Sequence, residues 1–180
     1  NDAGAGAAAA LGVVFKDKDN NEFIPVGKTL KNIYKIDKSN LNPMLKDVEI
    51  VTMCDIDNPL HGINGAAYIF GPQKGADENM VKELDEGLKH IDSIVKKDLN
   101  LDLSNVKGAG AAGGMGFGMV AFLNSTLQMG IETVLDTVKF DDLLDDTDLV
   151  ISGEGKIDSQ SIRGKVVIGI AKRTKKKNVP

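Results

Sequence analysis

The sequence has almost no cysteine, no excess of positive charge and no long apolar run. Its one cysteine, Cys54, excludes an internal disulfide framework, and no signal peptide opens the chain, so we expect a reducing, cytoplasmic location. No apolar run approaches the ~18 residues that a membrane span requires. The 22 basic residues are outnumbered by 26 acidic ones, and the net charge of −4 offers no positive field for nucleic acid. We therefore expect a soluble chain whose partners are neither nucleic acid nor membrane.

Two common kinase signatures are missing as well. The pattern GxxxxGK[ST] does not occur, which disfavours a P-loop kinase, and the histidine-bearing catalytic loop of protein kinases is absent too. What is present is a chain of 180 residues, long enough for one domain with a sizeable core or for one domain plus pieces of another. It begins NDAGAGAAAALG, already inside a small-residue helix, and it ends KKKNVP, like the first residue of a strand. We expect a piece of a larger protein.

The order of the predicted elements indicates an α/β fold. The hydrophobic and β-branched patterns predict, in order, a helix over 3–11, a hairpin of 13–16 and 22–26, a short helix over 30–34, a strand over 48–56, a helix over 77–97, a strand over 148–152 and a helix over 159–177. The strand over 48–56 ends in Asp57-Asn58-Pro59, which cannot continue a central strand, so it delivers a loop. The run KRTKKK places cations at the negative end of the last helix.

The stretch GAGAAGGMGFG, from Gly108 to Gly118, contains GxGxxG, the pattern that cradles a dinucleotide pyrophosphate. A lone match is weak, because a chain rich in glycine and alanine satisfies it easily. The pattern is informative only where it follows a strand and opens a helix.

Two strand-to-loop transitions carry residues suited to phosphate and metal chemistry. The first, DIDNPLHGINGAAYIFGPQKGA, has glycines for tight turns, Asn58, and the positive charge of Lys74. In the second, ISGEGKIDSQSIRGK, the carboxylates of Glu154 and Asp158 are hard oxygen ligands of the kind that Mg²⁺ prefers. Arg163 and Lys165 follow about one helical turn later and could meet phosphate oxygens. On spacing alone, phosphoryl transfer and a purely structural role for these loops both stay open.

Five blocks occur together and in order: NDAGAG, DNPLHGINGA, FGPQKGA, GAGAAGGMGFG and GEGKIDSQSIRGK. In this order they resemble the signature blocks of the type I glycerate kinase family, over essentially the whole chain. The resemblance implies transfer of the γ-phosphate of ATP to D-glycerate, more readily at the 2-hydroxyl than at the 3-hydroxyl, with Mg²⁺. Family members are much longer, so this chain resembles their central portion, and we expect it to be folded but inactive by itself. Whether the protein forms a homodimer stays open.

The resemblance also implies the domain organisation. It predicts an inserted α/β domain with a mixed sheet over 13–147, flanked by edges of a Rossmann-like or flavodoxin-like domain over 1–12 and 148–180. In this family the glycine block resembles a small-residue turn that enters a helix. A nicotinamide-dependent dehydrogenase is therefore disfavoured, and Glu132 imitates the ribose-binding acid of that fingerprint only by coincidence.

The resemblance assigns roles to residues of this sequence. Asp2, Lys74 and Asp158 are the expected catalytic residues: Asp2 would orient the substrate hydroxyl or a metal-bound water, and Lys74 would neutralise phosphate. Glu154 and Asp158 are the expected metal ligands, with a general base as the other catalytic role open to them. The expected substrate- and phosphate-binding residues are Asn1, Asn58, Gly108, Gly110, Gln160, Arg163 and Lys165. Structural alternatives remain for each: a helix N-cap for Asp2, a solvated lysine, and turn or cap roles for the loop carboxylates.

One departure from the family pattern suggests a second function. The first block usually reads NDGGAG, whereas this sequence has Ala3 at the first of those glycines, and its Cβ could weaken a backbone contact with phosphate. A non-catalytic binding or interaction domain of the same fold is therefore the alternative. We expect His61 and His90 to be structural or exposed, and Cys54 to act as a small buried hydrophobe.

Overall fold

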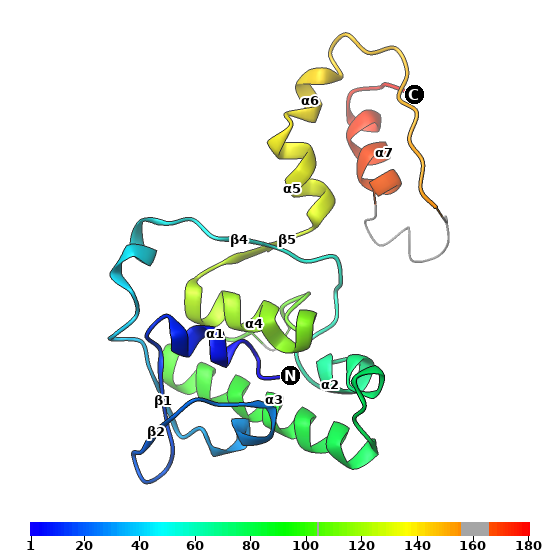
Figure 1. Cartoon of the computed structure of the whole chain (residues 1–180). Helices are drawn as coiled ribbons and strands as arrows, with labels where there is room; N and C mark the ends of the chain where they lie inside the picture. The colour runs from blue at the N-terminus through cyan, green and yellow to red at the C-terminus, as the bar shows by residue number, and fades with distance from the viewer. Residues whose placement is uncertain (104, 156–165) are drawn as a thin grey trace. The chain divides into compact units, whose positions relative to one another are not determined.

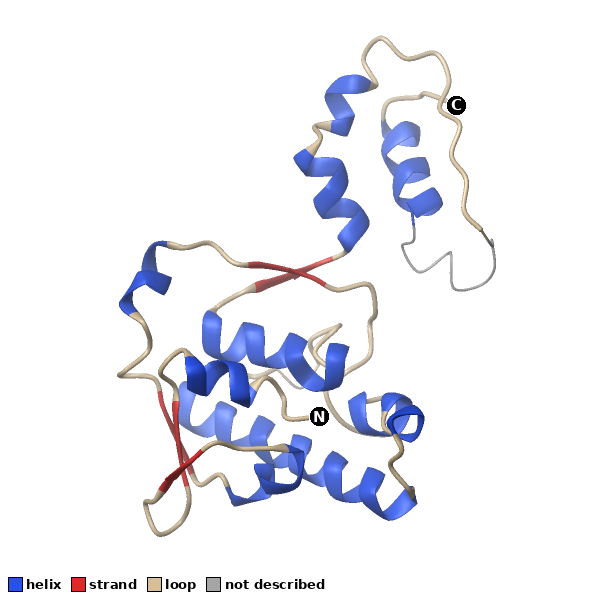
Figure 2. Ribbon diagram, viewed as in Figure 1, coloured by secondary structure: helices blue, strands red, loops and turns tan. Residues whose placement is uncertain are grey.

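The computed structural model describes residues 1–103, 105–155 and 166–180. The chain divides into two compact units, Asn1–Leu127 and Gln128–Pro180 (Figure 1). The first unit contains both helices and short strands, while helices are the regular elements that follow Gln128 in the described part of the second (Figure 2). The predicted α/β class is confirmed. No helix within the described ranges is both long and apolar enough to cross a membrane.

The first unit opens with a helix and a small antiparallel sheet. Helix α1 (Ala5–Ala10) leads into β1 (Val14–Lys16) and β2 (Glu22–Phe23), so the predicted helix and hairpin are confirmed. Strand β3 (Lys35–Asp37) pairs with the other side of β1, giving the order β2-β1-β3. Both pairings are antiparallel, and Phe15 lies opposite Phe23 on one side and Ile36 on the other.

Three short 3-10 helices and a short α-helix connect these elements to the rest of the unit. Their bounds are η1 (Gly27–Asn32), η2 (Pro43–Asp47), α2 (Ala66–Phe70) and η3 (Pro72–Lys74). The helix predicted over 30–34 is η1, which begins earlier because the Thr29 hydroxyl accepts a hydrogen bond from the Val26 N–H. It ends before Tyr34, whose N–H donates to the Lys16 carbonyl and joins the sheet instead.

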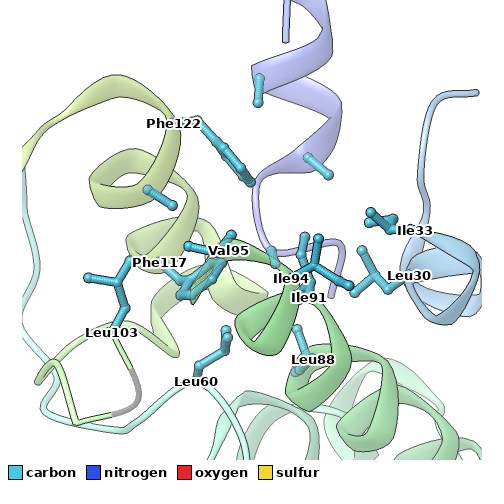
Figure 3. Close-up of a cluster of buried hydrophobic side chains, with 14 of the residues drawn as sticks. Leu30, Ile33, Leu60, Leu88, Ile91, Ile94, Val95, Leu103, Phe117 and Phe122 are labelled. Carbon is cyan, nitrogen blue, oxygen red and sulfur yellow. The ribbon is translucent and has the colours of Figure 1, made fainter. Parts of the chain in front are cut away.

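The long helix α3 (Glu78–Leu99) confirms the amphipathic pattern and supplies one wall of the core. Asp77 begins it by accepting the Met80 N–H, and Asn100, in the left-handed conformation, ends it. Its buried side chains face residues of η1, of the loop before α2 and of α4 (Figure 3). The largest fully buried side chains are Phe15, Phe117, Phe122, Leu30, Ile33, Leu60, Leu88, Ile91 and Val95.

Helix α4 (Ala111–Leu123) packs against α1 through glycines. Three of its first residues, Ala112, Gly113 and Gly114, have left-handed backbone angles, so regular helical geometry begins only after them. A Cβ on Gly118 would lie 2.4 Å from the carbonyl oxygen of Ala3, which leaves no room for any side chain. The backbone before α1 therefore rests directly on the backbone of α4.

The strand predicted over 48–56 is shorter and more exposed than expected. Strand β4 (Val51–Met53) pairs with β5 (Thr126–Gln128) in a two-stranded sheet. Val51 and Met53, at the two ends of β4, are both exposed. Cys54, directly after β4, is buried as expected for a small hydrophobe.

The described helices of the second unit are α5 (Gly130–Thr137), α6 (Phe140–Leu143) and α7 (Val166–Lys176). The strand predicted over 148–152 is wrong: this segment is not assigned to a strand, and Ile151 is 88% exposed. The Val150 N–H donates to the Pro180 carbonyl, but a pair of β-strands is defined by a series of such backbone hydrogen bonds and not by a single one. The predicted last helix is confirmed from Val166 onward, while its part over 159–165 lies outside the described residues.

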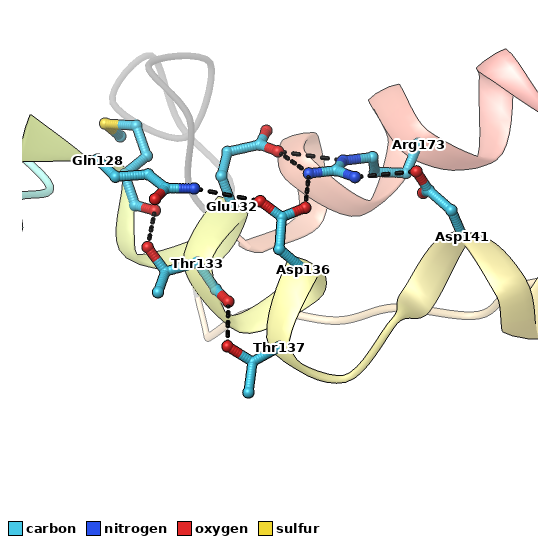
Figure 4. A network of polar contacts seen from close by, with 8 residues as sticks. Gln128, Glu132, Thr133, Asp136, Thr137, Asp141 and Arg173 are labelled. Carbon is cyan, nitrogen blue, oxygen red and sulfur yellow. Dashed lines mark hydrogen bonds and ion pairs between the residues drawn. The ribbon is translucent and has the colours of Figure 1, made fainter. Parts of the chain in front are cut away.

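An arginine joins the three described helices of the second unit (Figure 4). The guanidinium of Arg173 contacts the carboxylates of Glu132 (2.6 Å), Asp136 (2.6 Å) and Asp141 (2.9 Å). The hydrogen bond with Glu132, followed by those with Asp136 and Asp141, raises the pKa of Arg173 above its already high ordinary value. Arg173 of the KRTKKK run therefore does more than place a solvated charge at the helix end, because it joins α7 to α5 and α6.

Candidate functional site

The N-terminal residues form a tight loop in which the Asp2 carboxylate accepts backbone N–H groups at the start of α1. One carboxylate oxygen of Asp2 accepts the Gly4 N–H (3.2 Å), and the other accepts the Gly6 N–H (3.1 Å). These donors are N–H groups that a helix start otherwise leaves unpaired. The N-cap residue of α1 is Gly4 and not Asp2. The Asp2 carboxylate still has lone pairs for a further donor, so its role stays a prediction.

Ala3, where the family pattern has glycine, adopts a conformation that favours glycine. Its φ is +53°, in the left-handed region, and Gly4 follows with φ +72°. Ala3 is fully buried, and its N–H donates to the Gly113 carbonyl at 3.3 Å. A non-glycine residue held in this region stores of the order of 1 kcal/mol of strain. The departure from the family pattern therefore has a physical cost at this position.

Asn1 lies against the glycine stretch with an unused acceptor. Its Oδ1 is buried and has no hydrogen-bond partner among the described residues. A Cβ on Gly113 would lie 2.6 Å from this oxygen, so the side chain points at the turn that opens α4. A buried polar atom without a partner costs free energy, and such an atom next to a glycine turn is a ligand-binding candidate.

The loop that carries Asn58 contacts the same glycine stretch from another direction. The Gly110 N–H donates to the Asn58 carbonyl at 3.0 Å, and the Asn58 Nδ2 donates to the Asn64 carbonyl at 2.9 Å. Gly108 has φ +84°, and its carbonyl accepts the thiol of Cys54 at 3.6 Å. The amide side chain of Asn58 is thereby fixed beside the turn.

Four predicted binding residues thus belong to one place in the first unit. The N-terminal loop and the loop after β4 both pack on the turn before α4, bringing together Asn1, Asn58, Gly108 and Gly110. The stretch from 105 to 110 leads into α4 without a strand, so the GxGxxG pattern lacks the strand that the dinucleotide fingerprint needs. The expected small-residue turn entering a helix is what the structure contains.

Lys74 is placed differently from these four. It is exposed at the end of η3, where its N–H donates to the Gly71 carbonyl. No hydrogen bond or ion pair joins its ammonium group to another residue that the structure describes. A free cation is compatible with phosphate binding and equally with solvation, so its role stays a prediction.

The remaining candidates belong to the second unit. Asp158, Gln160, Arg163 and Lys165 lie outside the described residues. Glu154 is half-buried, and its Oε2 is buried with no hydrogen-bond partner in the described ranges. The described residues contain no group of three or more metal-ligating side chains. An unpartnered carboxylate oxygen such as the Glu154 Oε2 is a suitable ligand for a cation, and the metal site itself stays a prediction.

The structure adds contacts that the sequence analysis did not predict, made by His61, Asp85 and Asp92. The His61 Nε2 lies 3.3 Å from the Asp92 Oδ2, and the Gly62 N–H donates to the Asp85 Oδ1 at 2.7 Å. Both contacts tie the Asn58 loop to α3. The spacing of seven between the two aspartates, which places them on one helix face, was the available signal.

A separate groove in the first unit has a volume of about 800 Å³ and does not involve the candidate residues. It is lined by residues of 38–50 and 122–126. The Lys38 ammonium at its wall donates to the Ala121 carbonyl at 3.1 Å, and burial lowers the pKa of this lysine. Because the Lys38 ammonium is hydrogen-bonded to the end of α4, it is not free to bind a ligand in the groove.

Known proteins resemble this chain over its whole length. The model of the glycerate kinase family matches residues 1–180. A glycerate 2-kinase of Escherichia coli K12 is 50% identical over 180 residues, covering 100% of this chain and 47% of that protein. A glycerate kinase of Bacillus cereus ATCC 10987 is 49% identical, with the same coverage. The chain spans about half the length of the curated relatives it matches.

A solved structure gives the same result for the fold. A crystal structure from Salmonella typhimurium LT2, whose description names glycerate kinase 2, superposes with a TM-score of 0.88 at 44% identity. It is covered to 48% of its length, and this chain to 100%. Neither a dehydrogenase nor a non-catalytic interaction domain is named among these relatives.

Proposed function

This chain belongs to the glycerate kinase family, and we propose that it forms part of the active site of a kinase that transfers the γ-phosphate of ATP to D-glycerate. The observation that carries the proposal is the match of the family over residues 1–180. We further propose the 2-hydroxyl as the acceptor, supported by the relative named glycerate 2-kinase at 50% identity. The activity belongs to a protein of the relatives' length.

Phosphoryl transfer depends mainly on positioning and on neutralising charge, and the gathered residues suit the first task. The amide side chains of Asn1 and Asn58 would bind the hydroxyl and carboxylate of glycerate, and the turn of Gly108 and Gly110 would let the substrate approach the backbone. Asp2 would accept the hydrogen of the attacking hydroxyl through a remaining lone pair.

The charge-neutralising groups are proposed to come from elsewhere in the chain. Lys74 is a free cation suited to a transferring phosphoryl group, and Arg163, Lys165 and Gln160 supply further donors for phosphate oxygens. Glu154 and Asp158 would hold Mg²⁺, which neutralises phosphate charge when bound. The orphaned buried Oε2 of Glu154 supports this assignment.

The test is a coupled assay of ADP release by the full-length protein with D-glycerate and MgATP. We expect turnover that requires all three components, and a phosphorus spectrum of the product that identifies the 2-phosphate. A well-folded sample without turnover above background would refute the proposal. The present 180 residues alone serve as a control and are expected to be inactive, because half the length of the relatives is not in this chain.

Two further properties are proposed with the activity. A cytoplasmic location is supported by the single free Cys54 and by the use of ATP. A homodimer is proposed from the several exposed large apolar side chains of the first unit, which include Ile24, Ile63 and Met80. Light scattering of the full-length protein gives the mass that decides the second point.

A further inference from the structure

Two carboxylates of α3 hold consecutive residues of the loop that carries Asn58. The Asp92 Oδ2 lies 3.3 Å from the His61 Nε2, and the Asp85 Oδ1 accepts the Gly62 N–H at 2.7 Å. The first contact is made by a side chain and the second by the backbone. Together they fix both the position and the direction of the chain at this point of the loop.

The two aspartates are placed by the helix that forms one wall of the core. They are seven residues apart, which is close to two helical turns, so they lie on one face of α3. Asp92 is 6% exposed, between the buried Ile91 and Ile94. A carboxylate so deeply buried is costly unless it is hydrogen-bonded, and the contact with His61 is one of the interactions that offset this cost.

From this anchor the loop reaches the candidate site within three residues. Leu60, next to His61, is fully buried, and its carbonyl accepts the Ala66 N–H at 3.0 Å. Asn58 then meets the glycine stretch through the Gly110 N–H. The Asn58 loop is therefore held by α3 on one side and by the turn before α4 on the other.

We propose that His61, Asp85 and Asp92 are positioning residues that set where the Asn58 amide meets the substrate. The inference rests on the proposed kinase function. It goes beyond a folding role because Leu60 already anchors the loop in the core, so removing the His61 ring leaves the fold but releases the outer part of the loop. The lost order then appears as weaker binding of glycerate.

The kinetic test compares His61→Ala and Asp85→Ala with His90→Ala in the full-length enzyme. His90 is the control because it lies on α3, as Asp85 and Asp92 do. Its Nε2 is 2.7 Å from the Ile33 carbonyl, away from the Asn58 loop. We expect the KM for glycerate to rise about three- to tenfold in the first two variants, the scale of one positioning hydrogen bond, while kcat and the KM for ATP stay near wild type. His90→Ala should leave the KM for glycerate unchanged.

Rescue variants separate positioning from a general loss of structure. Asp85→Asn and Asp92→Asn keep an acceptor oxygen, so we expect the KM for glycerate to stay within about twofold of wild type in both, below the rise expected for the alanine variants. If an alanine variant fails to fold, the asparagine variant together with His61→Gln carries the comparison. An unchanged KM in folded His61→Ala, or an equal rise in His90→Ala, overturns the inference.

A second readout needs no turnover. Amide hydrogen exchange at Gly62 and Gly110 should be faster in His61→Ala than in wild type, and unchanged in His90→Ala, because only the first variant releases the loop. If the wild-type enzyme shows no kinase activity, the proposed function fails while the exchange still reports whether the loop is held. Equal exchange at both glycines in all variants overturns the positioning role.

Discussion

The Gly110 N–H donates a hydrogen bond to the Asn58 carbonyl at 3.0 Å, and this bond joins the two loops that form the candidate site. The approach is closer than any side chain allows, since a Cβ on Gly110 would lie 2.2 Å from the carbonyl oxygen of Pro59. The neighbouring atom belongs to the backbone and cannot rotate away. The site therefore depends on glycine at this position for a steric reason.

Replacing Gly110 with alanine should destabilise the first unit by about 2–3 kcal/mol, the usual scale of overpacking. Denaturant unfolding of the variant measures it. Gly153→Ala is the matched control, because a Cβ there meets nothing within 4 Å, and we expect it to leave stability close to wild type. An unfolding curve of Gly110→Ala that coincides with wild type would contradict the steric argument.

Ala3 and Ala112 share a left-handed backbone, with φ of +53° and +51°, but differ in burial. Ala112→Gly should stabilise the protein by about 0.5–1 kcal/mol, because only strain is removed at an exposed position. Ala3→Gly should gain about 1 kcal/mol less, since it also loses a buried methyl group. Thermal unfolding of the two variants, side by side, measures the difference. Equal gains would show that the Ala3 methyl contributes nothing to packing.

Long periodic elements could be predicted from the sequence, and short strands could not. The pattern over 77–97 fixed α3 because a one-sided apolar stripe of that length has few other solutions. The runs over 48–56 and 148–152 were both predicted to be strands from their apolar residues. The first contains a three-residue strand, and the second contains none in the described structure. A strand depends on partners far away in sequence, which a local pattern does not contain.

Removing Arg173 should loosen the second unit. Arg173→Ala leaves Glu132, Asp136 and Asp141 without their shared cation, and these carboxylates then repel one another. Lys177→Ala removes a single exposed pair with Asp145 and serves as the control. We expect faster amide exchange in α5 and α7 for the first variant and little change for the second. High salt should reduce the difference between wild type and Arg173→Ala, because it screens these charges.

The hairpin turn should make stability depend on pH through Asp17. Its carboxylate accepts the Asn21 N–H and also the Asp19 N–H, and these bonds lower its pKa below the ordinary 3.8. A lowered pKa in the folded state means that the contribution is present above the unfolded-state pKa and is lost as pH falls through the folded-state pKa. Asp17→Asn should thus be less stable than wild type at pH 7, with the gap closing in strong acid. A gap that persists unchanged at low pH would exclude this linkage.

Asp158→Asn in the full-length enzyme should lower kcat by ~100-fold or more, the scale of losing a catalytic group. Tm should change little, because a loop carboxylate contributes little to folding. Glu154→Gln tests the partner ligand in the same assay. Near-normal turnover in Asp158→Asn, or a Tm that falls together with activity, would return Asp158 to a structural role.

The sequence motifs predicted part of the candidate site. They did not predict the contacts between residues that are far apart in the sequence. The blocks containing Asn1, Asn58 and Gly110 marked the loops that the structure brings together. His61 was expected to be structural or exposed, since it stands at a position that the family pattern leaves open. Its partner Asp92 is 31 residues away, and only the packing of α3 reveals the pair.

The contact of Ala3 and Gly4 with Gly118 is one of backbone against backbone, and this limits how the protein can change over time. Where two side chains meet, an enlargement on one side can be repaired by a smaller residue on the other. Here the atoms that face Gly118 are the Ala3 carbonyl group and the Gly4 Cα, and a Cβ on Gly118 would meet the Ala3 carbonyl oxygen at 2.4 Å. No substitution can shrink a carbonyl group, so a screen for second-site suppressors of Gly118→Ala should return only revertants to glycine.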